Sequence, residues 1–91
     1  MWLPAILYYL SINNGEAYKI GITNRSIKER FCNEDLAKIT VISETSYELG
    51  KEAYDEEQKI LKEYSMYKYK GKNLLRSGNS ELFEKDISCW F

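Results

Sequence analysis

Two runs of apolar and aromatic residues open the chain, and a polar turn sequence separates them. Residues 4–12 are rich in isoleucine, leucine and tyrosine, and residues 16–23 place Tyr18, Ile20 and Ile22 at alternate positions. Alternation with a period of two is typical of a β-strand, and an Asn-Gly step between two such runs is a strong hairpin signal. We therefore predict a β-hairpin with a two-residue turn at Asn14-Gly15.

The rest of the pattern predicts helices and one further strand. Residues 24–34 predict a short helix with Ser26 at its N-cap, and 37–45 predict a β-branched third strand. Ser46 is a candidate cap for a long helix over 47–65, residues 66–78 predict a loop, and Ser80 is a candidate cap for a last helix over 81–87. This order predicts one α+β domain over residues 1–91, with a small three-stranded antiparallel sheet flanked by helices.

The predicted turn fixes which hairpin residues share a face of the sheet. With a two-residue turn, Tyr8 lies opposite Gly21 and Leu10 lies opposite Lys19, so Tyr8 and Lys19 share one face. Gly21 leaves open space opposite the Tyr8 ring. We expect this face to be polar and open to solvent. The other face, which we expect to be the core face, carries Tyr9, Tyr18, Ile20 and Ile22.

Composition narrows the chemistry that the chain can perform. It has no histidine, which excludes a Ser-His-Asp triad, a Cys-His pair and a histidine base. Its two cysteines, Cys32 and Cys89, form no metal-binding pattern, and we expect them to be reduced and buried, a disulfide being the alternative. The apolar start of the chain is too short to span a membrane and lacks the basic region of an export signal. We expect a cytoplasmic protein.

Charge is segregated along the sequence although the formal net charge is −1. Residues 44–57 hold six acidic residues and one lysine, whereas 59–76 hold six basic residues and one glutamate. This pattern predicts one negative and one positive face. Basic residues interleaved with Tyr67 and Tyr69 suit a nucleic-acid backbone, although a solvated loop is the alternative. The predicted nucleic-acid contacts are Arg25, Lys28, Lys68, Lys70, Lys72 and Arg76.

Four residues form a candidate catalytic set: Tyr8, Lys19, Arg30 and Glu81. An ammonium beside a phenol favours its ionised form, so that a tyrosine can act as a base. A guanidinium can stabilise charge on a phosphate, and one carboxylate can hold a divalent ion. The set therefore suits hydrolysis of a phosphodiester. The alternatives are an ordinary solvent-facing hairpin and a structural ion pair for Arg30.

Taken in order, these motifs resemble the GIY-YIG endonuclease superfamily, and in particular a short branch found in phage and fungal proteins. "ILY" (6–8) stands where the family has GIY, and "KIG" (19–21) stands where it has YIG, with a lysine that is usual in this branch. Arg30 falls at the position of the family's helix arginine, and "SELF" (80–83) matches its late glutamate motif. The resemblance spans residues 5–84.

The resemblance implies metal-dependent hydrolysis of DNA. It assigns Tyr8 as general base aided by Lys19, Arg30 as a contact to the scissile phosphate, and Glu81 as the ligand of Mg²⁺ or Mn²⁺, with Gly21 as a structural residue of the site. Ile6 and Leu61 depart from the family pattern, Leu61 standing where this branch often has a histidine. Glu57, within the apolar stripe of the long helix, is either an edge residue or a support for the site.

A second function remains open from the sequence. The chain could be a weakly active or inactive nuclease-fold module that binds nucleic acid or a protein partner, with the acidic segment as the partner surface. DNA is the expected partner of the enzyme, and a homodimer or a recruiting protein is left open, because no separate specificity domain is present in these 91 residues.

Overall fold

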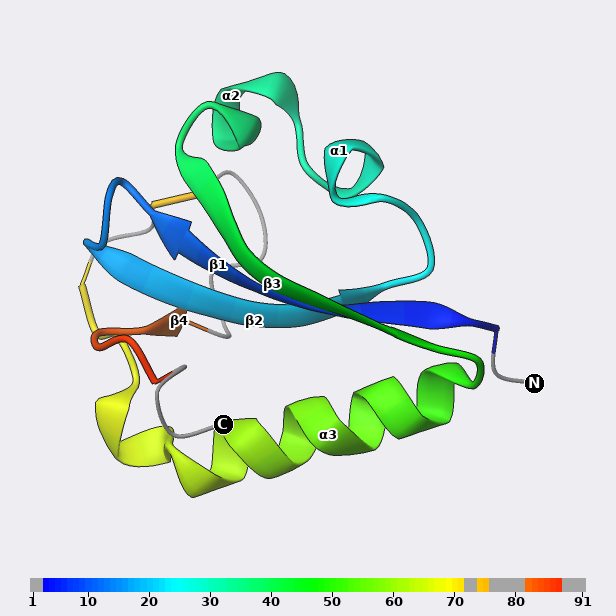
Figure 1. The fold of residues 1–91 in the computed structure, drawn as a ribbon. Helices are drawn as coiled ribbons and strands as arrows, with labels where there is room; N and C mark the ends of the chain where they lie inside the picture. The colour runs from blue at the N-terminus through cyan, green and yellow to red at the C-terminus, as the bar shows by residue number, and fades with distance from the viewer. Residues whose placement is uncertain (1–2, 72–73, 76–81, 88–91) are drawn as a thin grey trace.

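The structure, a computed structural model, describes residues 3–71, 74–75 and 82–87. It contains a four-stranded antiparallel sheet with the strand order β3-β1-β2-β4 (Figure 1). The α+β class is confirmed, with one strand more than the sequence predicts. The elements are β1 (Ala5–Ile12), β2 (Ala17–Thr23), α1 (Ile27–Arg30), α2 (Asn33–Leu36), β3 (Ile39–Tyr47), α3 (Gly50–Glu63), the 3₁₀ turn η1 (Ser65–Tyr67) and β4 (Leu82–Phe83).

The hairpin register is confirmed, whereas its turn is longer than predicted. Tyr8 pairs with Gly21 and Leu10 pairs with Lys19. A four-residue loop over 13–16 replaces the predicted two-residue turn and keeps the same pairs. Both asparagines of the loop have positive φ, a conformation that asparagine tolerates, and the Asn13 amide donates to the Lys38 carbonyl at 2.8 Å. This bond to another segment removes Asn13 from the β1–β2 ladder.

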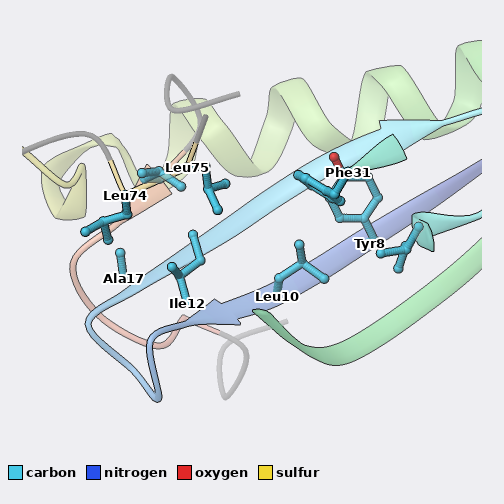
Figure 2. Packing of buried hydrophobic residues seen from close by; sticks show 9 residues of the cluster. Tyr8, Leu10, Ile12, Ala17, Phe31, Leu74 and Leu75 are labelled. Atoms are coloured by element: carbon cyan, nitrogen blue, oxygen red, sulfur yellow. The ribbon is translucent and has the colours of Figure 1, made fainter. Parts of the chain in front are cut away.

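Both faces of the sheet are covered, so the predicted polar face is wrong. The face that carries Tyr8 is a hydrophobic core under α1 and residues 74–75 (Figure 2). The opposite face carries Tyr9 and Ile20 and packs under α3, on the other side of the sheet from α1 (Figure 1). The run 5–10 is nearly continuous in apolar and aromatic residues, which is typical of a strand buried on both faces. Lys19 is a buried charged residue on the Tyr8 face.

The segment after β2 forms two single-turn helices instead of one helix. Ser26 caps α1 as predicted: its hydroxyl accepts the Glu29 amide at 3.2 Å, and the Glu29 side chain reaches back to the Ser26 amide. Extended backbone at Phe31 and Cys32 then separates α1 from α2. Cys32 is a free, exposed thiol at the N-cap of α2, so the expectation that it is buried is wrong; Cys89 lies outside the described residues.

The long helix begins later than the sequence predicts. β3 continues to Tyr47, so Ser46 lies in a strand opposite Ile6 and caps no helix. The helix α3 begins at Gly50, whose amide donates to the Leu3 carbonyl at 2.8 Å. Ser46 and Tyr47 extend the strand by pairing with Ile6 and Ala5 of β1, and the bond from Gly50 to Leu3 holds the start of the helix. Within the ranges that the structure describes, no helix is long and apolar enough to cross a membrane.

The predicted last helix is a strand and a turn where the structure describes it. Leu82 pairs with Lys19, and Phe83 pairs with Tyr18. Leu82 packs in the Tyr8 core and Phe83 in the Tyr9 core. Adjacent residues can serve opposite faces in a strand, because successive side chains alternate, but not in a helix. Because Leu82 and Phe83 pack in cores on opposite faces of the sheet, this segment forms a strand rather than a helix.

The Tyr9 hydroxyl ties the end of the described chain to the sheet. It donates to the Asp86 carboxylate at 3.1 Å and accepts the Ile87 amide at 3.0 Å. Its ring stacks on Tyr18 with centroids 6.0 Å apart. Burial raises the pKa of the Tyr9 phenol well above its ordinary value, an effect that Asp86 reinforces and the Ile87 amide opposes. Tyr9 is thus a neutral structural tyrosine, whereas its neighbour Tyr8 is the predicted general base.

We expect Tyr9→Phe to lower the free energy of unfolding by about 1–2 kcal/mol, because the buried Ile87 amide loses its acceptor. Urea denaturation followed by circular dichroism measures this difference. Tyr18→Phe is the matched control, since it keeps the stacked ring, and should change stability by less than about 0.5 kcal/mol. Equal effects of the two substitutions would contradict the assigned role of the Tyr9 hydroxyl.

Candidate functional site

Tyr8 and Lys19 lie on adjacent strands and share one face of the sheet. The Tyr8 ring lies across Gly21, where a Cβ atom would come within 2.6 Å of the ring's Cζ and 3.0 Å of its Cε1. A side chain at this position would therefore have to displace the ring. The sequence predicts open space opposite Tyr8, whereas in the structure the ring itself fills that space.

Phe31 connects Tyr8 to the helix that carries Arg30. The rings of Phe31 and Tyr8 meet edge to face, with centroids 5.8 Å apart and planes at 79°. The Arg30 guanidinium lies 5.0 Å from the centroid of the Phe31 ring, within the range of a cation–π contact. The sequence motifs do not place Phe31 among the candidate site residues. Phe31 directly follows Arg30 in the sequence. This adjacency was the signal in the sequence that Phe31 also holds Tyr8 and Arg30 in place.

Tyr8 and Lys19 are almost fully buried, with exposed fractions of 2% and 1%. Leu74 and Leu75 belong to the cluster that covers this face (Figure 2). The cover is anchored by Lys38, whose ammonium donates to the Leu74 carbonyl at 3.2 Å. The phenol and ammonium predicted to face solvent therefore lie inside a core.

Three predicted site residues lie outside the described residues: the metal ligand Glu81 and the basic residues Lys72 and Arg76. The described part of the site brings a phenol together with cationic side chains, and these are not ligands that Mg²⁺ or Mn²⁺ prefers. Within the described ranges, no three carboxylate or thiol side chains gather into a group that could hold a metal. The candidate catalytic set contains one carboxylate, that of Glu81. Its ability to hold a metal ion therefore depends on Glu81.

Glu57 is a buried carboxylate on α3, so its interpretation as a partly exposed edge residue is wrong. Its exposed fraction is 7%, and it lies in a buried stripe with Ala53 and Ile60. Its carboxylate accepts the Gln58 side-chain amide at 3.1 Å. Ile60 of the same stripe packs in the Tyr9 core, so this stripe serves the face of the sheet opposite Tyr8.

The predicted nucleic-acid contacts that the structure describes fall into two groups. Arg25 is exposed just before α1, and Lys28 is exposed on α1. Lys68 and Lys70 are exposed next to β4, where residues 67–69 exchange backbone hydrogen bonds with 82–84. Figure 1 shows α1 and η1 at different ends of the molecule. The two groups therefore do not form one continuous patch.

Two adjoining hollows give solvent access to the arginines at the α1 end. They measure about 460 Å³ and 390 Å³ and share Ala5, Thr23 and Asn24 in their lining. Arg30 lines the first, and Arg25 lines the second. Thr23 accepts the Arg25 amide at 3.1 Å, which orders the entry to α1. An anion can approach Arg30 here without entering the Tyr8 core.

Comparison with protein-family models, with curated proteins and with solved structures found no match to this chain. The GIY-YIG resemblance therefore stays a prediction that rests on the motif residues.

We expect Gly21→Ala to destabilise the protein by about 1–3 kcal/mol, because the added methyl group forces the Tyr8 ring to move. A double-mutant cycle isolates this cause. In a Tyr8→Leu background the same glycine substitution should cost clearly less, as measured by urea denaturation. An unchanged cost in that background would mean that the Tyr8 ring does not impose the glycine.

Proposed function

We propose that the protein is a metal-dependent endonuclease of the GIY-YIG type that hydrolyses phosphodiester bonds in DNA. One observation carries the proposal: Tyr8, Lys19 and Gly21 share one face of the hairpin, and Phe31 joins Tyr8 to Arg30. Cytoplasmic location and use of Mg²⁺ or Mn²⁺ are parts of the same proposal.

Each side chain has a distinct task in this reaction. Tyr8 takes a proton from the attacking water, and the Lys19 ammonium on the neighbouring strand favours the phenolate that this requires. Arg30, reached through the hollow at the α1 end, binds the scissile phosphate. Glu81 would hold the divalent ion, which when bound stabilises charge on the leaving oxygen.

A second candidate function follows from the burial of the site. With 2% of Tyr8 exposed, a phosphodiester cannot reach the phenol while Leu74 and Leu75 cover it. This observation favours a nuclease-fold module that binds nucleic acid through its exposed basic residues and cleaves weakly or not at all. The two functions differ in one measurable property, which is cleavage that depends on Tyr8.

We expect the protein to nick supercoiled plasmid in the presence of Mg²⁺ or Mn²⁺. Tyr8→Phe and Glu81→Gln should each lower the nicking rate by about 100-fold or more, because they remove the base and the metal ligand. Gel electrophoresis of plasmid over time measures the rate. Tyr54→Phe, on the exposed side of α3, is the matched control and should cleave at the wild-type rate.

Circular dichroism of each variant keeps loss of folding apart from loss of activity. Wild-type protein that leaves the plasmid intact, or Tyr8→Phe protein that nicks as fast as wild type, would contradict the enzyme and leave the binding module as the function.

For either function we expect the double variant Lys68→Glu and Lys70→Glu to weaken binding to a fluorescent DNA duplex by about tenfold or more. Removal of phosphate contacts should also reduce the steepness with which affinity falls as salt rises. Fluorescence anisotropy over a series of salt concentrations measures both quantities. The double variant Lys51→Glu and Lys62→Glu on α3 carries the same change in charge and should bind as wild type. Equal losses in both would show a net-charge effect rather than a binding surface.

A further inference from the structure

β3 is a long strand at the edge of the sheet. It spans nine residues, and in the strand order it has β1 as its neighbour on one side. In the part of the chain that the structure describes, no strand pairs with its outer edge. Such an edge presents unpaired amide and carbonyl groups that can pair with another extended chain.

The side chains of β3 give this edge little protection. Residues 40–46 are all exposed, including Val41 at 43% and Ile42 at 40%. The strand contains one charged residue, Glu44, and it has neither the lysine nor the proline that often blocks an edge. One irregularity interrupts its pairing, where the register shifts between Tyr9 and Leu10.

A groove of about 360 Å³ lies beside this strand, between β3 and α3. Leu7, Ile20 and Ile60 supply its apolar lining, and Ser43, Thr45 and Tyr47 line it from β3. The α3 side contributes Glu56, Lys59 and Glu63. The groove thus combines an apolar interior with two carboxylates and one ammonium at its helical wall.

The surroundings of the groove are acidic. Segment 44–57, which comprises the end of β3 and residues 50–57 of α3, has six acidic residues against one lysine, Lys51, which is paired with Asp55. Charge of this sign opposes a nucleic-acid backbone and favours a basic protein segment. Lysine and arginine suit the groove in particular, because their aliphatic stems lie along apolar surfaces while the charged end stays near carboxylates.

We propose that β3 and the groove bind an extended, basic segment of a partner protein. The segment adds an antiparallel or parallel strand to the outer edge of β3, about 4.8 Å from it. Its side chains on the α3 side of the sheet enter the groove, where a lysine or arginine stem contacts Leu7 and Ile60 and its charge meets Glu56 and Glu63. Tyr8 also lines the groove, but its ring packs in the core on the opposite face of the sheet, where the proposed nuclease site lies.

A nine-residue fluorescent peptide of alternating valine and lysine tests the proposal with the full chain. Fluorescence anisotropy measures binding, and hydrogen exchange should show slower amide exchange in β3 by at least about tenfold at saturation. The double variant Glu56→Lys and Glu63→Lys should weaken binding by about tenfold. The double variant Glu16→Lys and Glu84→Lys has the same charge change at exposed positions outside the groove and should bind as wild type.

Two peptide controls and one measurement of assembly complete the test. A peptide methylated at alternate amide nitrogens cannot pair along that edge and should lose binding, and a valine–glutamate peptide should not bind. No slowing of exchange in β3, or equal weakening by both charge variants, overturns the proposal. So does a dimer in sedimentation experiments whose interface protects β3, because a second copy would then occupy this edge.

Discussion

The register between β1 and β2 is the constraint on which the rest of the structure depends. Tyr8 and Tyr9 are adjacent in sequence and face opposite sides of the sheet. One ring fits over Gly21 beneath Phe31, and the other places its hydroxyl between Asp86 and the Ile87 amide. A shift of one residue would exchange these environments and put each ring where its contacts do not exist. Both cores and the candidate site therefore rest on one pairing.

The candidate site shares its residues with a hydrophobic core. A lysine with 1% of its surface exposed is uncommon in proteins, because moving an ammonium out of water is costly unless it is paired. Such groups often occur at functional sites. The same leucines that shield Tyr8 and Lys19 from water would also strengthen electrostatic interactions between them. Folding thus requires Leu74 and Leu75 to cover this face, whereas the proposed hydrolysis requires DNA to reach it.

Local signals in the sequence predict the parts of the fold that local interactions determine. The register of the hairpin and the Ser26 cap are decided within a few residues, and both are correct, although the turn is longer than predicted. The start of α3 depends on a bond to Leu3, and β4 depends on cores built by distant strands. The burial of Tyr8 likewise depends on Leu74 and Leu75. Pattern within a segment cannot predict these contacts, because they are set by residues far along the chain.

The contact between Tyr9 and Asp86 joins residues separated by 77 positions in the sequence. Contacts of this separation form late in folding, since a long loop must close before they gain energy, whereas a hairpin closes within microseconds. During synthesis the β1–β2 hairpin leaves the ribosome long before residues 82–87 exist. A nascent chain therefore carries Tyr8, Lys19 and Arg30 while the strand that pairs with Lys19 is still missing. The candidate site therefore cannot form until residues 82–83 have been synthesised, because they supply the strand that pairs with Lys19.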